Sequence, residues 1–116
     1  RNIYLSKAGT AVRESLQTGI TAAGTIITDA TDLTSVHSIV TTTAASTGVQ
    51  LWDAPIGAML TVVNRGANTL KVYPSSGSDA INTLGAGNPA SLTAGLGGIF
   101  IRNAAATWAA ISGGAL

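Results

Sequence analysis

Short apolar runs separated by polar breaks recur along this chain, and their alternation predicts strands. The plainest pattern is a pair of runs, Met59–Val63 and Thr69–Tyr73, on either side of a short polar segment. Glycine and asparagine tolerate the positive φ of a tight reversal, so this stretch predicts a β-hairpin. Its tip consists of Asn64, Arg65, Gly66, Ala67 and Asn68, which we expect to face solvent or a partner. Alternation places Leu60, Val62, Leu70 and Val72 on one apolar face, which we expect in the core.

Further strand-like runs follow the same pattern, with Gly, Pro and Asn between them. They are Thr25–Thr28, Ser35–Thr43, Gly48–Trp52, Ala80–Leu84, Ala90–Thr93, and a second hairpin of Gly98–Arg102 with Thr107–Ser112. No segment after residue 25 keeps a 3.6-residue period, so helices are not expected there. About eight short strands indicate an all-β antiparallel domain, either a sandwich, a jelly-roll-like fold or a small barrel. The runs show no fixed repeat length, which argues against a β-solenoid.

Residues 1–24 differ from residues 25–116, and we divide the chain into an N-terminal arm and a β-domain. The arm contains three basic residues, Arg1, Lys7 and Arg13, which we take as a candidate interaction arm. Ala11–Gln17 is long enough for two helical turns, and an extended arm docked on a neighbour is an equal alternative. Three basic residues do not make the basic stripe typical of nucleic-acid binding, so nucleic acid is not an expected partner.

Charge is scarce in this chain. Charged residues make up 9% of it and the net charge is +1, against about 25% charged residues in typical soluble proteins. Uncharged Thr, Ala, Gly and Ser residues are abundant in place of charged ones. Electrostatic repulsion between copies is therefore weak, and we expect the protein to work in an assembly. The chain contains no cysteine, which excludes disulfides and cysteine-based zinc sites. The longest apolar stretch, Ala94–Ile101, is far shorter than the ~20 residues of a membrane helix, so no membrane partner is expected.

The reactive groups do not form a pattern typical of an enzyme. The single histidine, His37, lies in a predicted strand, and the chain has no Gly-x-Ser-x-Gly elbow, so we expect a surface or interface position for it. Asp29 and Asp32 lack the spacing of a calcium loop and fit turn chemistry better. Gly85–Ala90 matches Gly-x-Gly-x-x-Ala, but no helix follows it, so we interpret it as a turn. We therefore predict no catalytic residues, no cofactor and no metal.

Four segments of the sequence also resemble those of a known protein family. They are VTTTAASTGVQL, TVVNRGANTLKVYP, SDAINTLGAGNPASLTAGLGGIFI and TWAAIS, within residues 25–112. In this order they resemble a family of small β-rich virion proteins of tailed bacteriophages. The recurrent positions, which we expect to be structural, are Asn64, Gly66, Asn68, Pro74, Ile81, Asn82 and Trp108.

The resemblance implies a bacteriophage structural protein, most simply a capsid decoration or cement protein on the exterior of the virion. Such a protein stabilises the head by non-covalent contacts with the major capsid protein and with itself, as a homo-oligomer. Residues 1–24 would then contact the capsid or a sister subunit. One alternative is a tail, baseplate or fibre module, which would trimerise and touch a host glycan. A carbohydrate-binding module with Trp52, Tyr73 or Trp108 as an exposed stacking platform is another.

Overall fold

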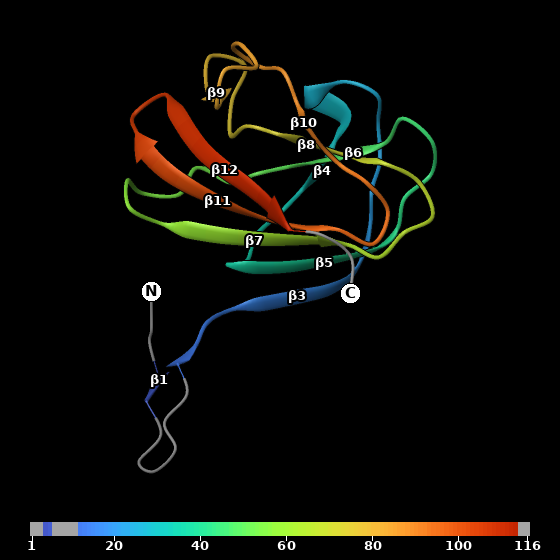
Figure 1. Cartoon of the computed structure of the whole chain (residues 1–116), viewed down its shortest axis with the longest axis horizontal. Helices are drawn as coiled ribbons and strands as arrows, with labels where there is room; N and C mark the ends of the chain where they lie inside the picture. The colour runs from blue at the N-terminus through green and yellow to red at the C-terminus, as the bar shows by residue number, and fades with distance from the viewer. Residues whose placement is uncertain (1–3, 6–11, 114–116) are drawn as a thin grey trace.

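The structure is a computed structural model that describes residues 4–5 and 12–113. Apart from one three-residue 3-10 helix, η1 (Ile27–Asp29), every regular element in these residues is a strand, so the all-β prediction is confirmed. A six-stranded sheet and a four-stranded sheet enclose one hydrophobic core (Figure 1). The larger sheet has the spatial order β3 (Leu16–Thr21), β5 (His37–Thr42), β7 (Met59–Asn64), β11 (Gly97–Ala104), β12 (Thr107–Gly113) and β9 (Ala80–Ile81). The smaller sheet has the order β10 (Ala90–Leu92), β8 (Leu70–Tyr73), β6 (Gly48–Gln50) and β4 (Thr31–Asp32).

Successive strands from β3 to β8 alternate between the two sheets, and neighbours within each sheet are parallel. In the larger sheet His37 lies between Leu16 and Thr61. In the smaller sheet Val49 lies between Thr31 and Val72. The chain therefore winds in stacked coils, which suggests a β-solenoid rather than the predicted antiparallel sandwich, jelly roll or barrel. The steps from 16 to 37 and from 37 to 61 are unequal, so the coils leave no fixed repeat in the sequence.

Antiparallel strands close one end of this stack. On the last coil, β10 pairs with β8 and β11 pairs with β7. The predicted second hairpin is confirmed, since β11 and β12 are antiparallel neighbours with an irregular register between Arg102 and Ala104. At the other end of the stack, β3 and β4 are the edge strands of their sheets.

The predicted hairpin Met59–Tyr73 is wrong, because its two strands belong to different sheets. The chain between β7 and β8 crosses from one sheet to the other and forms a β-arch. Hairpins and arches present the same alternation, because in both cases each strand buries one face. The predicted core positions are confirmed, with Leu60 at 2% and Val62, Leu70 and Val72 at 0% exposure.

Two predictions near the N-terminus also change. The predicted strand Thr25–Thr28 is wrong: the chain turns at Gly24 (φ 73°) and forms η1. A helix over Ala11–Gln17 is also wrong for its described residues, since they contribute to β2 (Val12–Arg13) and β3. β2 pairs with β1 (Tyr4–Leu5) in a short ladder that projects from the body (Figure 1). The two-sheet body thus begins before Thr25, at β3, which contributes Ile20 to the core.

Candidate interaction surface

The outer face of the six-stranded sheet carries apolar and hydroxyl side chains. Along β5, β7 and β11 the inward residues are buried, for example Val40, Val62 and Phe100, and the residues between them point outward. Register places the outward residues of neighbouring strands beside one another. We call this surface the uncharged sheet face. It consists of Leu16, His37, Ile39, Met59, Thr61, Val63, Gly97, Ile99, Ile101, Ala109 and Ile111.

Several large apolar side chains on this face are exposed to solvent. The exposed fraction is 60% for Leu16, 52% for Met59 and 67% for Ile111. A shallow groove of about 310 Å³ crosses the face between β7, β11 and β12. Gly97 and Gly113 are paired in the register of β11 and β12, and they help to form the groove because neither residue has a side chain. Contiguous exposed apolar surface of this kind marks interaction sites in soluble proteins.

A second hollow adjoins the end of this face. It has a volume of about 460 Å³ and is lined by Val36, Trp52, Pro55, Ile56, Gly57, Ala58, Met59 and Leu60. Trp52 is half-buried, and its indole Nε1 donates to Ser35 O at 3.1 Å. The other two aromatic residues considered for a stacking platform, Tyr73 and Trp108, are only 5% and 1% exposed. The proposed carbohydrate platform is therefore wrong for Tyr73 and Trp108.

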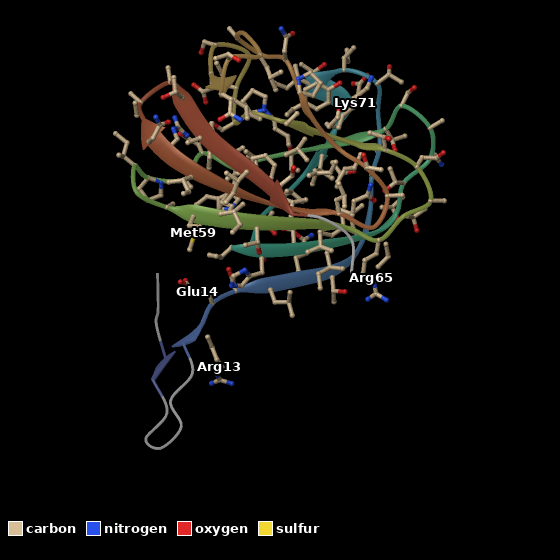
Figure 2. All side chains as sticks on the ribbon, in the orientation of Figure 1. Arg13, Glu14, Met59, Arg65 and Lys71 are labelled. Carbon is tan, nitrogen blue, oxygen red and sulfur yellow. The ribbon has the colours of Figure 1, made fainter. Side chains whose placement is uncertain are left out.

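Several charged residues that the structure describes lie away from the uncharged sheet face, whereas Arg13 and Glu14 lie just before Leu16, at its β3 edge. Lys71 points outward from the four-stranded sheet, on the side of the molecule opposite Met59, and Arg65 lies on the arch (Figure 2). Asp32 lies on β4 of the same smaller sheet, and Asp29 lies on η1, which precedes β4. The outward positions of β5, β7, β11 and β12 include no Asp, Glu, Lys or Arg.

One arginine is buried in a polar network behind the face. Arg102 Nη1 donates to Asp53 Oδ1 at 3.1 Å and to Ser75 Oγ at 3.0 Å, and Nη2 lies 3.6 Å from Asp79 Oδ2. Its guanidinium carbon lies 5.2 Å from the centre of the Trp108 ring, within the range of a cation–π contact. The network ties the loops after β6 and β8 to β11, which is a structural role. The residues of this network are far apart in the sequence, and no local motif predicts it.

The segment predicted as a hairpin tip is only partly exposed. Arg65, Ala67 and Asn68 are exposed, whereas Asn64 is fully buried. Asn64 Nδ2 donates to Asn68 O and Leu92 O, at 2.8 and 2.9 Å. Its Oδ1 accepts bonds from Thr43 Oγ1 and from the backbone N–H of Gly66, at 2.9 and 3.0 Å. The amide therefore joins the loop after β5, the arch between β7 and β8, and the end of β10.

Other recurrent positions also make structural contacts. Pro74, Ile81 and Trp108 are buried. Asn82 adopts a positive φ of 50°, and its side-chain amide both donates to Ala110 O and accepts from Ala110 N. This amide thus takes the place of a backbone partner for β12.

The basic arm is described only in part. Arg13 is exposed at the end of β2 (Figure 2), and Arg1 and Lys7 lie outside the described residues.

The candidate chemical groups do not come together as a reaction site. His37 Nδ1 lies 2.6 Å from Thr61 Oγ1, across β5 and β7. Within residues 4–5 and 12–113, no group of three or more His, Cys, Asp or Glu residues could hold a metal ion. Gly85 and Gly87 adopt positive φ and a strand follows them, so their interpretation as a turn is confirmed. No helix in the same residues is long and apolar enough to span a membrane.

Comparisons of the chain with models of protein families, with curated proteins and with solved structures give no match.

Proposed function

We propose that this protein is a structural component of a tailed bacteriophage particle, a decoration or cement protein on the outside of the head. In this role it binds the major capsid protein and further copies of itself through non-covalent contacts. The observation that carries the proposal is the uncharged sheet face, on which Leu16, Met59 and Ile111 are more than half exposed. Such a surface is a liability for a free monomer and is useful to a protein that is covered in an assembly.

The rest of the molecule supports a structural role. Stability comes from two sheets around a core and from buried polar groups such as Asn64 and Arg102, which hold loops in place. The single histidine, His37, contacts the Thr61 hydroxyl on the sheet face, whereas the carboxylates of Asp53 and Asp79 contact Arg102. We accordingly propose no enzymatic activity and no cofactor.

A tail, baseplate or fibre module is the second candidate, and the stacked parallel coils favour it. A solenoid grows along one axis by adding coils, as an elongated fibre requires. The edge strands β3 and β4 leave one end of the stack open to such an addition within the described residues. In this alternative the hollow beside Trp52 is where a host glycan would be sought.

Binding to purified phage particles distinguishes the two locations. The full-length chain is labelled and incubated with heads, with tails and with complete particles that lack it, and bound protein is counted after sedimentation. We expect saturable binding to heads. Binding to tails alone would support the second candidate, and no binding to any of them would refute both.

A charge-reversal variant tests the arm. The variant replaces Arg1, Lys7 and Arg13 with glutamate, and Arg13 lies on β2, outside the two sheets of the body. We expect head occupancy to fall at least tenfold while the circular dichroism spectrum stays that of the wild type. Equal occupancy of the two proteins would show that the arm does not contact the capsid.

A further inference from the structure

We propose that the uncharged sheet face is the surface through which one copy of this chain packs against a second copy. The inference rests on the proposed function, because it names the self-contact that such a particle protein would use. The two copies would meet as facing sheets, about 10 Å apart, with outward side chains interdigitating as in a sandwich core.

The chemistry of the face suits burial. Register aligns a row of outward residues across five strands, namely Ile111, Ile99, Thr61, His37 and Leu16. The ends of this row are the most exposed, with Ile111 at 67% and Leu16 at 60%. Covering apolar surface contributes roughly 25 cal/mol per Å² removed from water. The bond between His37 Nδ1 and Thr61 Oγ1 partly satisfies the polar atoms near the middle of the row.

The area of the face is sufficient for a specific contact. Five strands at ~4.8 Å spacing, each about six residues long at ~3.3 Å per residue, cover roughly 24 by 20 Å. Each copy therefore offers about 500 Å², and two copies bury about 1,000 Å² together. This total reaches the roughly 1,000 Å² that separates biological interfaces from incidental contacts.

The lack of charge on most of the face favours a second copy as the occupant. The outward positions of β5, β7, β11 and β12 carry no Asp, Glu, Lys or Arg, so two copies can meet over these four strands without burying an unpaired charge. Arg13 and Glu14 lie just before β3, at the edge of the face. A strongly acidic or basic partner would find no counter-charge on these strands. The net charge of +1 also gives two copies little long-range repulsion.

Sedimentation velocity of the isolated full-length chain tests the inference. The variants Ile111→Asp and Met59→Asp each add a carboxylate at an exposed position of the face, where the monomer itself tolerates it. Ser91→Asp is the matched control, because Ser91 is exposed on β10, in the other sheet, beside Lys71. We expect the wild type and Ser91→Asp to associate above the 11.5 kDa chain mass. Both face variants should sediment as monomers, with association weakened about 100-fold or more.

A crosslinking experiment provides a second test, because the chain has no cysteine of its own. Thr61→Cys, in the middle of the face, should form a disulfide-linked pair on mild oxidation, and Ser91→Cys should not. A monomeric wild type, association that survives both face variants, or equal crosslinking at the two positions would overturn the inference. No phage component is present, so these outcomes are independent of head binding: a chain that self-associates but never occupies particles would sink only the proposed function.

Discussion

Asn64 gives the sharpest test of the fold, because its environment separates an arch from a hairpin. Its side chain makes four hydrogen bonds, with Thr43, Gly66, Asn68 and Leu92, and it has no exposed surface. Asn64→Ala removes all four. Each bond contributes about 1 kcal/mol net, and the carbonyl of exposed Asn68 regains water. We therefore expect a loss of about 3 to 4 kcal/mol in unfolding free energy, a large part of the ~5–15 kcal/mol typical of a domain.

Urea and thermal unfolding, followed by circular dichroism, measure this loss. For a chain of this size it corresponds to a melting temperature lowered by roughly 10 to 15 °C. The matched control is Asn103→Ala, because Asn103 accepts a bond from Thr107 Oγ1 at an exposed position. That change should stay within about 0.5 kcal/mol of the wild type. A loss below about 1 kcal/mol for Asn64→Ala would refute the buried arch and restore a solvent-facing hairpin tip.

Three further substitutions test other parts of the account by the same unfolding assay. Gly66→Ala should lower the unfolding free energy by about 2 kcal/mol or more, because a Cβ at Gly66 would overlap both the side chain and the backbone N of Thr43. The control Gly77→Ala should be nearly neutral, since a Cβ there meets no atom within 4 Å. Equal effects of the two substitutions would contradict this packing. Ser38→Ala should be neutral or stabilise by up to about 1 kcal/mol, since Ser38 Oγ is buried and finds no hydrogen-bond partner among the described residues; a loss above 1 kcal/mol would reveal a partner. Val62→Asp should prevent folding because it buries an unpaired carboxylate, whereas Val63→Asp, on the outer face of the same strand, should fold. A native circular dichroism spectrum for Val62→Asp would show that the register of β7 is wrong.

The alternation of apolar residues predicted burial well but not sheet membership. Leu60, Val62, Leu70 and Val72 are buried as predicted, because a strand of either sheet must turn one face to the core. Whether β7 pairs with β8 depends on what else competes for its edges, and β5 and β11 occupy both of them. Those partners come from distant parts of the chain, so the local pattern could not reveal them.

The buried polar groups were hidden for a related reason. Asparagine is common in turns, so the residue type did not indicate that Asn64 is buried. The buried Asn64 amide donates to Leu92 O, and Leu92 lies far along the chain. Arg102 shares the inward face of β11 with Phe100, and only the folded loops supply Asp53 and Ser75 as its partners.

The uncharged sheet face did leave a signal in the sequence. β7 is apolar at inward Leu60 and Val62 and also at outward Met59 and Val63. Apolar residues on both faces of a strand are typical of strands that are covered on both sides. The same holds for Ile99 and Ile101 beside Phe100 on β11. This pattern indicates a second surface to be covered.

Cryo-electron microscopy of particles that carry this protein tests the central claim most directly, because it shows both the location of the chain and the neighbour of its sheet face. We predict density for the two-sheet domain on the outside of the head, with copies meeting through the uncharged sheet face around Thr61 and Ile99. Density confined to the tail, or head-bound copies whose uncharged sheet face points to solvent, would contradict the account.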